Sequence, residues 1–157
     1  MKNVLILGIG NLVLNDAGVG VHIVHMLKSL VMPHGVDVLD GGVGNETLID
    51  IVCEYNHLIW IEAAVDGSPV GTVRRFSPQY PADYQQLLHN HEPVVRNMID
   101  SIHSHEHIPH VDMLSISVHR NPTIGIELSP EVRRVIPQVM QLIFEILEDT
   151  RTVRYFR

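Results

Sequence analysis

The segment VLILGIGNLVLNDAGVG, residues 4–20, decides the fold class because its apolar pattern changes period across one short turn. Residues 3–9 form a continuous apolar run, which is typical of a strand buried on both faces of a sheet. After the glycine-rich turn, apolar side chains recur at helical spacing over residues 17–31. His22 and His25 fall on the opposite face of this helix, where we expect solvent. A strand followed by a helix predicts the first unit of an α/β fold.

The rest of the chain continues this alternation. Strands are predicted at residues 36–40, 57–64, 72–76 and 111–118, and helices at residues 45–55, 92–103 and from 130 onward. Ser129 is placed to cap the last helix, and Pro130 to occupy its first position. No repeat or linker divides the chain, so we predict a single domain over residues 1–157, with a mainly parallel sheet covered on both faces. In such sheets, ligands bind beyond the carboxyl ends of the strands.

Composition narrows the class of protein. The chain has 157 residues, of which 45% are apolar and 18% charged, as expected of a globular domain. Its net charge is −7 and it has only 11 Lys and Arg residues without a basic cluster, which argues against nucleic-acid binding. We expect neither a signal peptide nor a membrane span. Cys53 is the only cysteine, so no disulfide or cysteine metal site is expected, and a cytoplasmic location fits.

The glycine-rich turn after the first strand has three interpretations. Gly8 and Gly10 fit the start of a dinucleotide-binding fingerprint, and Asp40 lies about where a ribose-binding acid would, but Val13 occupies the third glycine position. The helix also begins too late to receive a pyrophosphate. A second interpretation is purely structural, because glycine permits tight turns and close packing of a helix on a sheet. The third is a metal site.

A metal site would use polar side chains near the carboxyl ends of the strands. Asp16 follows the first strand and Glu62 ends the third, so parallel strands would bring their oxygens near one another. His91 lies in the polar segment before a helix and would supply a nitrogen. Carboxylates with an imidazole suit zinc, nickel or iron better than calcium.

Four segments in order resemble the hydrogenase maturation proteases, the endopeptidases that process the large subunits of nickel–iron hydrogenases. They are LILGIGNLVLNDAGVGV, VLDGGVGNETL, HLIWIEAAVDGSPVGTVRRF and NPTIGIELSPEV. The resemblance implies a three-layer α/β/α sandwich with a twisted, mostly parallel five-stranded sheet. It also implies a metal-dependent, aspartic-type endopeptidase that removes the C-terminal extension of a hydrogenase large-subunit precursor after nickel insertion. The nickel would come with the precursor and serve for recognition.

The resemblance assigns site residues one at a time. Glu62 stands at the end of the third strand, where the family usually has aspartate, and His91 matches the family histidine, with His89 as the alternative. Asp16 matches the first of two consecutive acids. The second acid, which is the ligand in the family, aligns with Ala17, and alanine cannot bind a metal.

Three explanations for this departure remain open. Asp16 rotates into the site with help from Asn15, or Glu62 binds bidentately and tolerates the loss. Alternatively, the chain is a divergent paralogue that binds a hydrogenase subunit or nickel without cutting. We expect Asp16, Glu62 and His91 to serve both metal binding and catalysis.

Two further segments carry residues with a possible role in binding or at the surface. The turn formed by Asp40, Gly41 and Gly42 resembles a family segment that contributes to recognition of the partner, although ordinary turn chemistry explains it equally well. The histidines at 103, 105, 107 and 110 match no family role, and we expect them at the surface, with incidental nickel binding as the alternative.

Overall fold

The structure is a computed structural model that describes residues 2–79 and 93–155. Its sheet has five strands in the order β2-β1-β3-β5-β4. The strands are β1 (Lys2–Gly8), β2 (Val36–Asp40), β3 (Tyr55–Ala64), β4 (Val73–Phe76) and β5 (His110–Ser117). All neighbours pair in parallel except β4, which runs antiparallel to β5. The prediction of a mostly parallel sheet is therefore confirmed.

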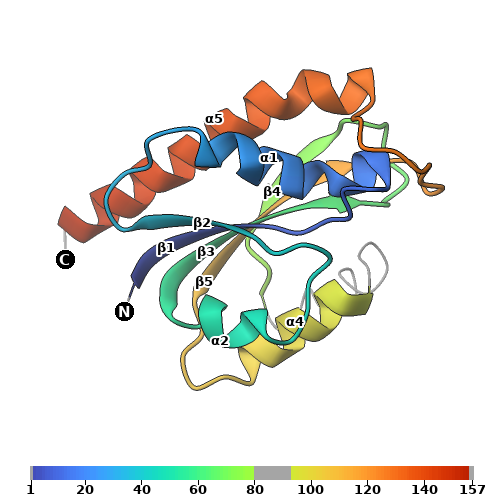
Figure 1. The fold of residues 1–157 in the computed structure, drawn as a ribbon. Helices are drawn as coiled ribbons and strands as arrows, with labels where there is room; N and C mark the ends of the chain where they lie inside the picture. Colours follow the sequence, from blue (N-terminus) through green and yellow to red (C-terminus); the bar gives the residue numbers. More distant parts are fainter. Residues whose placement is uncertain (1, 80–92, 156–157) are drawn as a thin grey trace.

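Helices cover both faces of the sheet and complete the three layers (Figure 1). On one face lie α1 (Val19–Lys28) and α5 (Pro130–Tyr155), and on the other lie α2 (Leu48–Val52) and α4 (Pro93–His103). Alternate residues of the central strands point into two separate apolar cores, one under each helix layer. This double burial explains why β1 and β3 read as continuous apolar runs.

The first helix differs from its prediction at both ends. A short 3-10 helix, η1 (Asn15–Gly18), precedes α1, and α1 ends at Lys28 rather than at residue 31. His22 is half-buried, so our expectation that it faces solvent was wrong, and burial together with the nearby His25 lowers its pKa. His25 is exposed as expected.

The helix predicted at residues 45–55 is much shorter than expected, because α2 covers only Leu48–Val52. Asn45 accepts a hydrogen bond from the backbone N–H of Thr47 at 3.0 Å, which forms a local turn before the helix instead of capping it. The helix stops at Val52, and a turn at residues 53 and 54 leads directly into strand β3, which begins at Tyr55. At the last helix the predicted cap is confirmed, since the Ser129 hydroxyl accepts from the N–H of Val132 at 3.4 Å.

Two glycines bring α1 against the carboxyl ends of β1 and β3. A Cβ atom on Gly20 would lie 2.3 Å from the carbonyl oxygen of Ile61 and 2.5 Å from that of Ile9. A Cβ atom on Gly8 would lie 2.3 Å from the carbonyl oxygen of Gly20. No side chain fits at either position, so this approach requires glycine. The structural interpretation of these two glycines is supported, and the contact places η1 beside the end of β3.

The described helices include none that is both long and apolar enough to cross a membrane.

Candidate active-site cavity

A cavity of about 1050 Å³ opens at the carboxyl end of the parallel strands. Five segments line it: the turn after β1, the turn after β2, the end of β3, the start of α4, and the loop between β5 and α5. In Figure 1 the blue turn after β1 and the orange loop before α5 lie at the same end of the sheet. The cavity therefore occupies the place where α/β folds bind ligands, as predicted from the order of the elements.

Glu62 supplies a deeply buried carboxylate to this cavity. It lies near the end of β3, opposite Ser115 of β5, and only 2% of its surface is exposed. Alternation along β3 places it on the same face as Trp60, toward α2 and α4. A carboxylate in such a place is costly to bury unless it is paired, hydrogen-bonded or used as a ligand. Its position agrees with the role expected from the sequence.

Asp16 also lines the cavity, but part of its carboxylate has a structural task. Its Oδ1 accepts a hydrogen bond of 2.7 Å from the backbone N–H of Ser129. Ser129 directly precedes α5, so the negative charge lies at the positive end of the helix dipole. This bond anchors η1 to the start of α5. Among the described residues Oδ1 alone is so engaged, which leaves Oδ2 as the atom able to serve a ligand.

Asn15 holds the wall of the cavity. Its side-chain amide donates to the hydroxyl of Thr123 at 2.7 Å and to the carbonyl of Thr123 at 3.1 Å, and its Oδ1 accepts from the N–H of Glu127 at 3.0 Å. Its backbone N–H donates to the carbonyl of Gly125 at 2.8 Å. From the sequence, one explanation had Asn15 assist Asp16 in binding the metal. Its side chain instead fastens the β5–α5 loop to the turn after β1.

The other members of the expected ligand set do not complete a metal site among the described residues. Ala17 lines the cavity, so the position of the missing acid does face the site. His91 and its alternative His89 lie outside the described residues. Within residues 2–79 and 93–155, no group of three or more metal-ligating side chains at ligand spacing includes Asp16 or Glu62. Asp16 and Glu62 by themselves offer only carboxylate oxygens. Such oxygens can bind a metal ion that another molecule, such as a substrate, already holds.

In the turn expected to recognise the partner, the carboxylate of Asp40 already makes contacts within the chain. Asp40 Oδ2 lies 2.6 Å from His25 Nε2, and Oδ1 accepts from the N–H of Gly42 at 2.8 Å. Burial opposes the charge of Asp40, but these two bonds outweigh it and hold its pKa below the usual range. The carbonyl of Gly42 accepts from the N–H of Gly10 at 2.8 Å, which ties this turn to the first one. The residue that reaches the cavity is the next one, Val43.

The sequence and the fold of this chain are similar to those of known proteins. The sequence profile of the hydrogenase maturation proteases matches residues 21–146. Over 150 residues the chain is 24% identical to the hydrogenase 2 maturation protease of Escherichia coli, covering 94% of this chain and 92% of that protein. It is 41% identical over 73 residues to the hydrogenase expression/formation protein HupD of Thiocapsa roseopersicina, covering 46% of this chain and 33% of that one.

Solved structures agree. The hydrogenase-maturating endopeptidase HybD from E. coli superposes with a TM-score of 0.83 at 23% identity, covering 96% of this chain and 94% of that chain. The hydrogenase 2 maturation peptidase of a Thaumarchaeota archaeon gives a TM-score of 0.73 at 26% identity, covering 94% and 99%. The profile match spans well over half of the chain and the architecture is shared along nearly its whole length, so this protein belongs to the hydrogenase maturation protease family.

Proposed function

We propose that this chain is an endopeptidase that removes the C-terminal extension of a nickel–iron hydrogenase large-subunit precursor after nickel insertion. The observation that carries the proposal is a cavity at the carboxyl end of the sheet with Glu62 buried in its wall and Asp16 beside it. The nickel belongs to the substrate and arrives with the precursor. Asp16, Glu62 and His91 are the residues proposed to meet it.

Each carboxylate has a distinct part in this proposal. Asp16 is fixed through Oδ1 at the start of α5, so Oδ2 is presented from a rigid position. Glu62 stands near the end of a central strand, where it pairs with Ser115 of β5 and directly follows Ile61, the last residue of β3 that pairs with β1. A metal bound in this way supplies Lewis acidity for a carbonyl or a water. The carboxylates orient the precursor, and Glu62 is the group proposed to take a proton from the attacking water.

The rim of the cavity suits a polypeptide with apolar side chains. Val43 and Ile126 line the cavity and remain largely exposed, and Ile124 of the same loop is 90% exposed. Burying such side chains against a partner is favourable by about 1.5–3 kcal/mol each. We propose that they receive the apolar residues of the C-terminal extension.

Ala17 favours a second candidate function. This residue faces the cavity at the position where the resemblance places the second acid. A chain that lacks that ligand can keep the binding surface and lose the cutting step. The alternative is therefore a paralogue that binds the precursor or its nickel without hydrolysis.

The test is the mass of the precursor. A nickel-loaded large-subunit precursor is incubated with the unmodified chain, with Glu62→Gln and with Glu145→Gln, the last being an exposed carboxylate on α5 that serves as control. We expect loss of a C-terminal peptide with the unmodified chain and the control, and none with Glu62→Gln. If the unmodified chain does not cut but Ala17→Glu does, the protein is the non-cutting paralogue. Equal cutting by Glu62→Gln contradicts the site assignment.

A further inference from the structure

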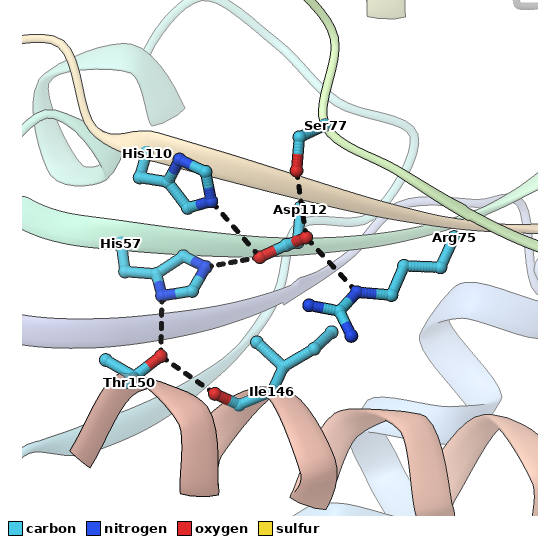
Figure 2. Close-up of polar contacts among 7 residues, drawn as sticks. All are labelled: His57, Arg75, Ser77, His110, Asp112, Ile146 and Thr150. Atoms are coloured by element: carbon cyan, nitrogen blue, oxygen red, sulfur yellow. Dashed lines mark hydrogen bonds and ion pairs between the residues drawn. The ribbon is translucent and has the colours of Figure 1, made fainter. Parts of the chain in front are cut away.

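A second group of metal-ligating side chains lies at the opposite end of the sheet from the cavity. His57 is near the start of β3, while His110 and Asp112 begin β5. His57 and His110 are direct partners in the parallel register, and Asp112 follows two residues later on the same face. Figure 2 shows the three side chains converging beside α5. One ligand atom from each residue lies within 4.8 Å of the others.

The two pairs of donor atoms that include Asp112 have nearly the spacing that a metal requires. Asp112 Oδ2 lies 2.8 Å from His57 Nε2 and 3.4 Å from His110 Nε2. In a tetrahedral zinc site with bonds near 2.0–2.1 Å, neighbouring donors stand about 3.3 Å apart. The two imidazole rings meet edge to face, with centroids 4.8 Å apart. Because the three ligand atoms lie within 4.8 Å of one another, an ion would be seated once the widest pair closed by up to about 1.5 Å, a movement that the exposed side chain of His110 can supply.

The hydrogen bond on the far side of the His57 ring fixes which nitrogen carries a proton. The hydroxyl of Thr150 donates to the carbonyl of Ile146 at 2.8 Å, so its oxygen must accept from His57 Nδ1 at 3.0 Å (Figure 2). With Nδ1 protonated, the Nε2 lone pair of a neutral ring points at the Asp112 carboxylate. That contact needs a cation between the atoms, either a proton on Nε2 or a metal ion. A histidine that donates its outer N–H to a fixed acceptor is the usual arrangement around a bound metal.

The carboxylate is held so that one oxygen faces the imidazoles. Asp112 Oδ1 accepts from the Ser77 hydroxyl at 3.0 Å and from Arg75 Nε at 3.3 Å. This leaves Oδ2 toward His57 and His110. Burial opposes ionisation of Asp112, but the hydrogen bonds from His57 and Ser77 and the charge of Arg75 lower its pKa to about 2. The residue therefore offers an anionic ligand at neutral pH.

His110 brings a second imidazole nitrogen to the same carboxylate oxygen. A protonated His110 would meet Asp112 Oδ2 as a further ion pair at 3.4 Å, whereas a neutral ring can direct a lone pair there. A metal ion accepts both lone pairs and the carboxylate together. The His110 side chain is 60% exposed, whereas those of His57 and Asp112 are buried, so an ion has a path from solvent and room for a water ligand.

We propose that His57, His110 and Asp112 form a binding site for a first-row divalent metal ion, with zinc as the natural candidate for two imidazoles and one carboxylate. The ion would cross-link β3 to β5, and through Thr150 it would tie the sheet to the end of α5. The site is separate from the cavity and independent of the proposed protease activity.

The test measures Zn²⁺ binding by calorimetry in the full chain carrying Glu62→Gln, which removes a carboxylate of the cavity. His110→Ala is compared with His34→Ala, which also removes an exposed histidine but lies outside the cluster. We expect one zinc site in the parent and in His34→Ala, with affinity reduced at least about tenfold in His110→Ala. Zinc should also raise the Tm of the parent and of His34→Ala much more than that of His110→Ala.

Two further variants sharpen the result. His110→Asp keeps a ligand at the exposed position and should recover most of the affinity. Thr150→Val removes only the acceptor for His57 Nδ1 and should weaken zinc by about 10–100-fold without removing a ligand. Equal zinc affinity and equal Tm response in the parent and His110→Ala would overturn the proposal and leave the cluster as an ion-pair network.

Discussion

Asn15 shows how one residue can organise the wall of the candidate active-site cavity. Its backbone has a φ of 47°, in the left-handed region that asparagine tolerates better than most residues. That conformation lets its side chain and its N–H reach residues 123–127 at the same time. The position thus combines a backbone requirement with a hydrogen-bonding requirement, and the two can be separated by substitution.

We expect Asn15→Ala to destabilise the chain by about 1–3 kcal/mol, since it removes three side-chain bonds and keeps a Cβ in the left-handed region. Asn15→Gly removes the same bonds but relieves the backbone, so it should be more stable than Asn15→Ala by about 1 kcal/mol. Urea unfolding measures both. Amide exchange at Glu127 should accelerate in both variants, and unchanged exchange would contradict the role given to this side chain.

Some contacts of individual residues could be predicted from the sequence and others could not. Glu62 could be placed in the site because it ends a strand whose apolar run is unmistakable. The bond from Ser129 to Asp16 could not be foreseen, because it joins segments 113 residues apart through a backbone N–H. His57 and Asp112 were missed for a related reason. Only the register between β3 and β5 places them together, and neither residue is remarkable within its own strand.

At the scale of elements, the link between β3 and β4 depends on one buried carboxylate. Asp66 Oδ1 accepts from the N–H of Ser68 at 3.0 Å and from the hydroxyl of Ser117 at 2.9 Å. Its Oδ2 lies 3.3 Å from Arg74 Nε on β4. The turn after β3, the antiparallel strand and the end of β5 therefore meet at a single side chain.

We expect Asp66→Asn to lower the free energy of unfolding by about 1–3 kcal/mol at pH 7, because it weakens charge-assisted hydrogen bonds. Burial opposes the charge of Asp66, but its bonds to Ser68 and Ser117 and the charge of Arg74 hold its pKa below the ordinary value of 3.8. The stabilisation is thus complete above about pH 4 and is lost as the pH falls through the lowered pKa.

Urea unfolding at pH 7 and at pH 3 should therefore show a large difference between Asp66→Asn and the unmodified chain at the higher pH and a smaller one at the lower. Asp149→Asn, an exposed residue of α5, is the control and should change little at either pH. A difference between Asp66→Asn and the unmodified chain that stays constant with pH would show that the charge of Asp66 does not stabilise this junction.

Element order was predictable because each long segment carries a strong period. The strands β1, β3 and β5 and the helix α5 were found near their observed bounds. The short helix α2 was overestimated, since a local turn at Asn45 precedes it and a turn at residues 53 and 54 ends it. The glycine-rich turn did not reveal the 3-10 helix, because its geometry depends on contacts with residues 125–129 rather than on its own composition.

At the scale of the whole molecule, the two ends of the sheet differ in character. The carboxyl end carries a large cavity with buried Glu62 and an exposed apolar rim. The amino end carries the compact cluster of His57, His110 and Asp112 beside the last turns of α5 (Figure 2). A parallel sheet separates the two regions, so changes at one end can be tested without disturbing the other.

The apolar rim should act in binding rather than in stability. Ile126 lines the cavity and is 69% exposed, so Ile126→Ser should change the free energy of unfolding by no more than about 0.5 kcal/mol. If a precursor buries this side chain, the same substitution should weaken binding by about tenfold or more. Val31 is 98% exposed just beyond α1, whose far end points away from the cavity, so Val31→Ser is the matched control.

Binding is best measured by calorimetry with a nickel-loaded precursor, in chains that also carry Glu62→Gln so that cutting does not consume the complex. The expected order of affinity is parent equal to Val31→Ser and both above Ile126→Ser, with equal urea midpoints for all three. This order holds whether the chain cuts the precursor or only binds it, because the rim acts before any bond is broken. Equal affinity of Ile126→Ser and Val31→Ser would mean that the precursor docks elsewhere. The cavity would then not be the substrate site.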